Sequence, residues 1–228
     1  MTELAQHGSD YSIVEAEEPD VLGRNLFAAG QLLASATAFF FLAFLFAYFY
    51  LRSVNNGGLW KPKHVDASVT WGTIVMACIV ASAMLVRFGR IDQEAGRREA
   101  FRLKGLGGLL LGVAALVVQA IGWTQQGFGP ADGGYASVYF GWTAFLWLFV
   151  LCTLFWLETV LATSYRYRNE PMGAATVPPG HASGDPHRTA HDIRNPVELN
   201  RASLAALSFY WSFLAGIAVL TWIVLDLV

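Results

Sequence analysis

Histidine is the side chain of this sequence with the clearest chemical use, either as a metal ligand or as a proton carrier. His181, His187 and His191 lie close together, and the step of four residues between the last two would align both imidazoles on one face of a helix. Several prolines between Pro178 and Pro196 interrupt a long helix there, and no cysteine accompanies the histidines. The pattern therefore favours a polar, solvated loop over residues 169–201, and we predict no metal ligands.

Other kinds of redox or hydrolytic site lack their residues. A membrane haem held by two helices needs histidines within apolar segments, and neither His7, His64 nor the three histidines above lies in one. Cys78 and Cys152 each stand alone inside an apolar segment, which predicts buried packing thiols without a disulfide or a dinuclear copper site. No Ser-His-Asp set, phosphate-binding loop or dinucleotide fingerprint occurs in a suitable context. We expect no catalytic residue and no cofactor in this chain.

Two polar side chains within apolar segments remain. Glu158 lies near the end of one segment, about two turns before Arg166, which favours an interfacial ion pair over a proton relay. Gln119 needs a partner in an apolar helix, which predicts an interhelical hydrogen bond. No charged residue falls at the middle of an apolar segment, so the sequence offers no obvious carrier for an ion or proton pathway.

The segments that position these side chains are long and apolar. The chain has 228 residues, of which 55% are hydrophobic and 14% are charged, and its mean hydropathy is +0.43. A soluble domain carries about 25% charged residues. From Gly105 to Ala131 there is no Asp, Glu, Lys or Arg, and Asp132 is the only charged residue before Glu158. The stretch 127–135 inside this apolar run is rich in turn formers. This pattern predicts two membrane helices joined by a tight turn.

We predict an all-α, multi-pass transmembrane bundle. The expected spans are about 25–51, 69–86, 105–123, 136–163 and 204–228, and they form one domain over 25–228 after a polar, acidic N-terminal arm, 1–24. The charged stretch from Arg87 to Lys104 is expected to be a solvated loop or a short surface helix. The glycine pair Gly108 and Gly112 predicts close contact between helices.

Charge predicts the direction of the spans. Twelve Lys or Arg residues fall on the side of the N-terminus and three on the other side, so the positive-inside rule places the N-terminus and loop 169–201 in the cytoplasm and the C-terminus outside. The acidic first twenty residues are unlike a basic signal peptide, so we expect the first span to be retained. The net charge of -2 gives no indication of a nucleic-acid partner.

Four stretches of the sequence carry a family resemblance. They are Phe46–Ser53 followed by Trp60-Lys-Pro62, then Gln119–Trp123, Asp132–Phe140 and Tyr210-Trp-Ser-Phe213. In order and spacing they resemble subunit III of the haem-copper oxidases, the cytochrome c oxidase type, over nearly all of residues 25–228. The larger members of that family have seven helices. A short form without the first two would have five and the orientation that the charge count predicts.

The resemblance implies a non-catalytic accessory subunit of a respiratory oxidase complex, which reduces O2 to water in aerobic electron transport and pumps protons. Haem and copper are expected in the partner subunits I and II. This chain is expected to pack on and stabilise subunit I, to hold phospholipid, and to lie in a bacterial plasma membrane. A cytochrome-containing, quinol-oxidising complex is a further expected partner in a supercomplex. The candidate residues for packing, lipid or partner contact are Arg52, Gln119, Trp123, Asp132, Tyr135, Glu158, Tyr210 and Trp211.

The sequence also departs from the family pattern. Acidic or histidine positions of the family fall on or near Ala36, Thr37, Gly122, Leu146, Phe149, Ser212 and Ala215. In the family these polar residues relate to lipid binding in a cleft and to proton uptake by subunit I, so these positions support neither role here. The departures indicate a divergent branch.

Four alternatives stay open. Two are related: the accessory subunit of a nitric oxide reductase, and that of a quinol oxidase. From another class come a small membrane transporter or a structural membrane protein without a redox partner. A transporter would show an internal repeat, or charged residues or Gly/Pro breaks at the middle of its spans, and the sequence shows neither a repeat nor a charge there.

Overall fold

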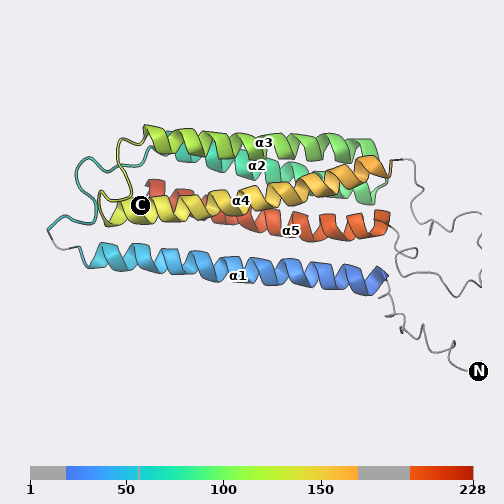
Figure 1. Ribbon diagram of the computed structural model, residues 1–228, viewed down its shortest axis with the longest axis horizontal. Coiled ribbons are helices and arrows are strands. Elements are labelled where there is room, and N and C mark those ends of the chain that lie inside the picture. Colours follow the sequence, from blue (N-terminus) through green and yellow to red (C-terminus); the bar gives the residue numbers. More distant parts are fainter. Residues whose placement is uncertain (1–18, 56, 169–195, 228) are drawn as a thin grey trace, which may run out of the picture.

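The computed structural model describes residues 19–55, 57–168 and 196–227, and the regular elements in these ranges are all helical (Figure 1). They are α1 (Pro19–Ser53), α2 (Val69–Glu94), α3 (Arg98–Gln125), α4 (Gly134–Arg166) and α5 (Pro196–Trp222), followed by a short π-helical segment, η1 (Ile223–Leu227). Each of the five long helices is long and apolar enough to cross a membrane, which confirms the predicted fold class. The three clustered histidines and most of the predicted N-terminal arm lie outside the described residues.

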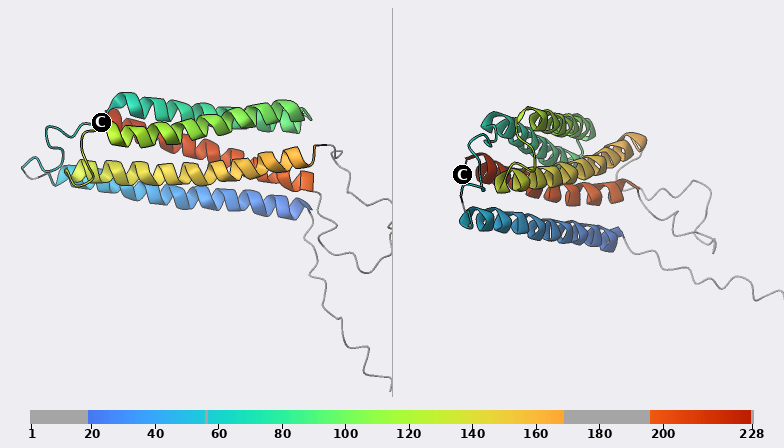
Figure 2. Two further views of the ribbon diagram at one scale, coloured as in Figure 1. Left: turned by 45° about the horizontal axis from the view of Figure 1, so that its top comes forward. Right: turned by 60° about the vertical axis from the view of Figure 1, so that its left-hand side comes forward.

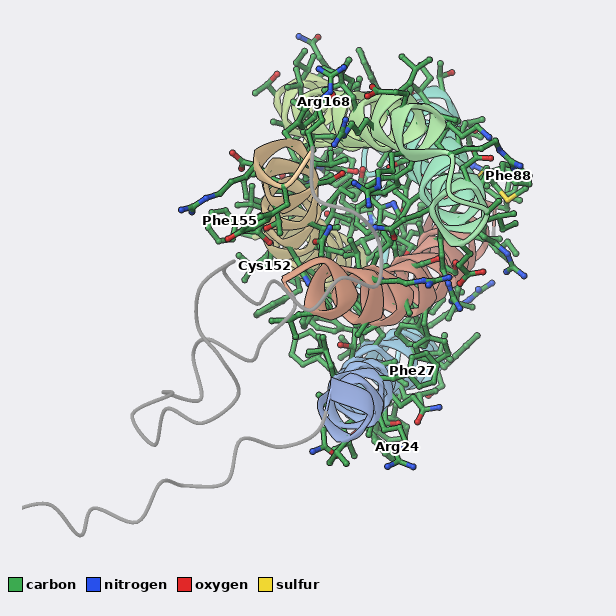
Figure 3. All side chains as sticks on the ribbon, turned by 90° about the vertical axis from the view of Figure 1, so that its right-hand side faces the viewer. Arg24, Phe27, Phe88, Cys152, Phe155 and Arg168 are labelled. Carbon is green, nitrogen blue, oxygen red and sulfur yellow. The ribbon has the colours of Figure 1, made fainter. Side chains whose placement is uncertain are left out.

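Helices α2, α3, α4 and α5 form a ring, and α1 packs on the outside of this ring (Figure 3). Neighbouring helices in the ring contact one another in the order α2, α3, α4, α5 and back to α2. α1 rests mainly on α5 and touches α4, and it runs along one side of the bundle (Figure 2). The direction in which these helices cross the membrane stays a prediction.

The seam between α1 and α5 repeats every seven residues of α1. Gly23 faces Ala202, Gly30 faces Ala206, and the Thr37 hydroxyl lies 3.0 Å from the Tyr210 hydroxyl. A Cβ atom added to Gly30 would lie 3.3 Å from the Ala206 Cβ, so the two backbones meet closely only because Gly30 has no side chain. Small residues allow this approach in the absence of a hydrophobic driving force between membrane helices.

The glycines of α3 let this helix pack closely on both of its neighbours in the ring. A Cβ atom on Gly108 would lie 3.0 Å from Val86 Cγ2 and 3.2 Å from the Ser82 carbonyl oxygen, both on α2. A Cβ atom on Gly112 would overlap the Leu154 side chain of α4. The predicted role of this glycine pair in close helix packing is therefore confirmed, with the two glycines facing different helices.

The helices extend beyond the predicted spans, and the expectation for the charged stretch was wrong. Arg87–Glu94 continues α2, and Arg98–Lys104 begins α3, so only Ala95–Arg97 lies outside the helices. Hydropathy marks where an apolar segment stops, whereas a helix continues as long as its backbone hydrogen bonds do. At 26 residues and about 1.5 Å per residue, α2 exceeds the roughly 30 Å of hydrocarbon, so a charged end can reach the aqueous interface.

The prediction for the two cysteines holds in part. Both thiols are free, as expected. Cys78 is half-buried, but Cys152 is exposed on the outer face of α4 (Figure 3), so it is not a buried packing thiol. Periodicity could not decide which face of α4 turns outward, because this helix is apolar all round.

Candidate functional site

Two neighbouring residues of α5 hold the helices on either side of it. The Tyr210 hydroxyl is hydrogen-bonded to the Thr37 hydroxyl of α1 at 3.0 Å, and the Trp211 Nε1 donates to the Ser82 Oγ of α2 at 3.0 Å. Both rings are 2% exposed or less. Because successive residues of a helix point about 100° apart, this pair reaches both α1 and α2. Tyr210 and Trp211 thus connect α5 to α1 and to α2 through buried hydrogen bonds.

Tryptophan side chains make the same kind of contact throughout the bundle. Six of the eight indole N–H groups donate to an oxygen on another helix. Trp142, for example, donates to the Thr221 hydroxyl at 2.7 Å, and Trp147 donates to the Leu116 carbonyl at 3.1 Å. A buried indole needs such a partner. These rings therefore join helices in addition to any contact they make with lipid at the interface.

At one end of the bundle, the loop after α1 meets the turn before α4. The Tyr135 N–H donates to the Trp60 carbonyl at 2.9 Å, and the ring of Trp60 meets the Tyr135 ring edge-on at 5.9 Å. Gly133 permits this contact, because its φ of 135° suits glycine and a Cβ atom there would lie 3.0 Å from the Leu59 carbonyl oxygen. Two of the stretches that carry the family resemblance, Trp60–Pro62 and Asp132–Phe140, are thus in direct contact.

Residues at this end of the bundle also bind η1, the last described segment of the chain. The buried Tyr135 hydroxyl donates to the Leu225 carbonyl of η1 at 2.6 Å. Gln126 bridges a second pair of segments, because its side chain donates to the Tyr139 hydroxyl at 2.8 Å and accepts from the Ser68 N–H at 3.0 Å. Lys61 Nζ lies 4.7 Å from the centre of the Tyr135 ring, close enough for a cation–π contact.

The opposite end of the bundle is held by charge. Asp92, 3% exposed, accepts hydrogen bonds from the Arg97 Nε at 2.9 Å and from Lys104. Arg102, 1% exposed, donates to Glu99 at 2.8 Å and to the backbone carbonyl of Ser164. These charge-assisted contacts fasten α2 to α3 and α3 to α4.

The remaining predicted residues have different surroundings. Trp123 donates to the Thr143 hydroxyl at 3.0 Å. Half-buried Gln119 lies near the Tyr139 hydroxyl on the neighbouring helix, and its expected interhelical hydrogen bond stays a prediction. Asp132 is exposed and accepts from the Gly129 N–H at 2.6 Å, so it shapes the turn. Arg52 is also exposed and lies beside the Tyr48 ring.

The expected ion pair of Glu158 was wrong. Glu158 is exposed on α4, and no ion pair joins it to Arg166, although the structure describes both residues. The guanidinium of Arg166 lies 5.7 Å from the centre of the Tyr167 ring instead. Eight residues along a helix span about 12 Å, which is too far for the two side chains to meet without bending along the surface.

The polar groups of the described residues mainly join one helix to another. No three of their His, Cys, Asp or Glu side chains group where a metal ion would need them. Their buried hydroxyl, indole and guanidinium groups are instead used in contacts between helices. Most buried polar groups thus find partners inside the bundle, whereas the Gln93 Oε1 and Asp226 Oδ1 atoms are buried without a hydrogen-bond partner among the described residues.

Comparison with known proteins adds a relative. The chain is similar to a cytochrome c oxidase subunit 3. That protein, from Formosania lacustris, is 27% identical over 142 residues, which is 60% of this chain and 54% of the relative. The matched part thus spans about half the length of the curated relative. No protein-family profile matches the chain.

Sequence reasoning missed several of the residues that hold the bundle together. Arg102, Ser82 and Thr221 were not singled out, because a serine, threonine or arginine near an apolar segment has no distinctive spacing. The signal that could have found them is the unusual number of tryptophans, since each buried indole requires an acceptor. Which hydroxyl serves which indole depends on the packing order of the helices, and no local pattern contains that information.

Proposed function

We propose that this chain is an accessory subunit of a respiratory haem-copper oxidase and acts by packing on and stabilising subunit I. The observation that carries the proposal is the 27% identity to a cytochrome c oxidase subunit 3 over 142 residues. The five membrane-spanning helices and the internal use of the polar groups are consistent with a structural subunit. In this proposal the complex transfers electrons to O2, and the haem and copper sites lie in partner subunits I and II.

A large apolar surface is available for such partners and for phospholipid. Along α1, Leu32, Phe39 and Phe46 are each more than 70% exposed, and on α4 the Phe155 ring is 68% exposed. In a membrane, such a surface is covered by lipid tails or by the helices of another subunit. We also propose that the complex lies in a bacterial plasma membrane; the apolar helices support a membrane location of this kind.

The proposal is tested by purifying the native assembly. A tag placed before residue 19 should bring down, in mild detergent, a haem-containing partner, and the preparation should take up O2 when reduced cytochrome c is added. Recovery of the tagged chain alone and without haem would contradict the proposal. Uptake with quinol but not with cytochrome c, or reduction of nitric oxide in place of O2, would direct the assignment to the corresponding related complex.

A matched pair of variants strengthens this test. Gly108→Leu should prevent α3 from approaching α2 and so reduce the amount of assembled complex, because a Cβ atom there already meets the Ser82 carbonyl. Gly216→Leu has nothing within 4 Å of the added Cβ and should leave the fold of this chain unchanged. If Gly216→Leu alone abolishes recovery of the partner while the chain stays folded, Gly216 lies on the contact surface.

A further inference from the structure

Two adjoining hollows lie at the charged end of the bundle, between α1, α2 and α5. One, of about 640 Å³, is lined by Arg24 and Phe27 of α1, Arg90 of α2 and Arg201 of α5. The other, of about 370 Å³, shares Phe27 and Arg90 and adds Arg87. We call them together the arginine groove, defined by Arg24, Arg87, Arg90 and Arg201. Arg24 and Phe27 lie at this end of α1 (Figure 3).

The arginine groove carries an excess of positive charge. The described part of its lining contains a single acidic residue, Glu94. The Glu94 carboxylate pairs with Arg90 at 2.8 Å, and its backbone carbonyl accepts from Arg201 at 3.5 Å. Among the side chains that the structure describes, no ion pair joins Arg24 or Arg87 to an acidic residue. The arginine groove is thus a concave site in which positive charges outnumber the described negative charges.

The contrast with the other side of the same end is sharp. There, Arg97 and Lys104 pair with Asp92, and Arg102 and Arg168 pair with Glu99. The basic residues around α3 therefore have acidic partners among the described residues, whereas the arginine groove has one, Glu94. An anionic group from outside the described residues would complete this second set of charges.

The acidic partner best placed to fill the groove belongs to the same chain. Residues 1–18 contain five acidic residues and no Lys or Arg, and they directly precede Pro19, five positions before Arg24. Extended chain spans about 3.3–3.6 Å per residue, so the acidic residues nearest to α1 can reach the groove. Covalent attachment gives the segment an effective concentration of roughly millimolar. We propose that the acidic N-terminal segment docks into the arginine groove.

Docking would fasten the helix that lies outside the ring. α1 rests on α5 and α4, and the segment would connect the beginning of α1 to the end of α2 through the arginines of both helices. It would also relieve the repulsion among four guanidinium groups. This inference goes beyond the proposed function and does not depend on it. An anionic phospholipid headgroup carries the charge for the same site, so the experiment must separate the two occupants.

Disulfide trapping tests the proposal without removing any charge. In a Cys78→Ser, Cys152→Ser background, Ala16→Cys is combined with Ile91→Cys, a half-exposed position that lines the groove. The control combines Ala16→Cys with Leu103→Cys, which is 73% exposed at the same end on α3. In phosphatidylcholine nanodiscs, we expect a mild oxidant to link the Ile91 pair at least about fivefold faster than the control pair. Equal rates for the two pairs would overturn the proposal.

The charge dependence identifies the occupant. Glu15→Gln, Glu17→Gln and Glu18→Gln together, or about 0.5 M salt, should remove most of the rate advantage, because screening and neutralisation weaken the same attraction. A rate advantage that ignores both changes would contradict docking by charge. Loss of the advantage when phosphatidylglycerol is included would assign the groove to a lipid phosphate and overturn the segment as its occupant.

A second measurement covers the case in which the cysteine variants fold poorly. Cleavage of the N-terminal segment by a glutamate-specific protease should be slow in the unmodified full chain and several-fold faster in Arg87→Glu and Arg201→Glu. Arg168→Glu provides the matched control, since Arg168 lies at the same end but outside the groove. Equal acceleration in all three variants would indicate a general effect of charge and contradict the proposal.

Discussion

The Trp211 Nε1 donates a hydrogen bond to the Ser82 Oγ at 3.0 Å, and the Ser82 Oγ donates in turn to the Gly108 carbonyl at 2.6 Å. One hydroxyl thus joins α5, α2 and α3. Ser82 is fully buried and Trp211 is 1% exposed, so neither group can turn to water if its partner is removed. An unpaired polar group in that position costs free energy that no solvent contact recovers.

Removing both partners of this pair should cost less than the sum of the single changes. We expect Trp211→Phe and Ser82→Ala each to lower the free energy of unfolding, with a coupling of about 0.6–1.7 kcal/mol between them, as measured for hydrogen bonds between membrane helices. The measurement is a double-mutant cycle by reversible unfolding in mixed micelles. Trp71→Phe is the control, because the Trp71 indole makes no hydrogen bond to the described residues. Zero coupling would show that the hydrogen bond between Trp211 and Ser82 does not stabilise the bundle.

Glycine packing predicts opposite effects at two positions. Gly108→Ala should destabilise the bundle by about 1–3 kcal/mol, because its Cβ would meet the Ser82 carbonyl, a backbone atom that cannot move aside cheaply. Gly216→Ala meets nothing within 4 Å and should be neutral or stabilising by up to about 1 kcal/mol through helix propensity. Thermal unfolding of both variants in one detergent checks the prediction, which fails if the two substitutions have the same effect.

The sequence contained enough information to predict the number of helices but not all of their ends. Five apolar segments, each about as long as a bilayer requires, predict five spanning helices. The charged residues after Val86 marked the end of the apolar segment, yet α2 continues to Glu94 because Asp92 finds partners in Arg97 and Lys104. Both partners lie beyond the end of α2, so the window that detects a span cannot detect them.

The candidate site was predictable as a set of residues but not as a set of contacts. The family resemblance singled out Tyr135, Tyr210 and Trp211, and each is buried and hydrogen-bonded to a different element. Their partners, Leu225, Thr37 and Ser82, are far away in the sequence and common in type. For Glu158, the nearest basic residue along the helix, Arg166, did not identify an ion-pair partner. Eight residues, about 12 Å along the helix axis, separate the two side chains.

Arginine and lysine should not be interchangeable at position 102. The guanidinium of Arg102 serves Glu99 and two oxygens of Ser164 at once, and a lysine ammonium lacks the planar fork needed to do so. We expect Arg102→Lys to lower the free energy of unfolding by about 1–3 kcal/mol, the range for a lost charge-assisted hydrogen bond. Arg166→Lys, at an exposed position of the same end, should change it by less than about 0.5 kcal/mol. Equal effects would contradict the role given to Arg102.

The Tyr135 hydroxyl should control the order of the end of the described chain. The Tyr135 hydroxyl donates to the Leu225 carbonyl inside the π-helical η1 segment. Tyr135→Phe therefore leaves that carbonyl without its partner while keeping the aromatic packing against Trp60. We expect amide exchange over residues 223–227 to accelerate about tenfold, which corresponds to the loss of roughly 1.4 kcal/mol of local protection.

The matched control is Tyr50→Phe, whose ring is 55% exposed on α1. It removes a hydroxyl of the same type without touching η1, so exchange over residues 223–227 should stay at the rate of the unmodified chain. Hydrogen–deuterium exchange read by mass spectrometry in nanodiscs resolves this segment from the rest of α5. Unchanged exchange in Tyr135→Phe would show that packing alone holds η1 in place, and a global acceleration would mean that the hydroxyl supports the whole bundle and not this end alone.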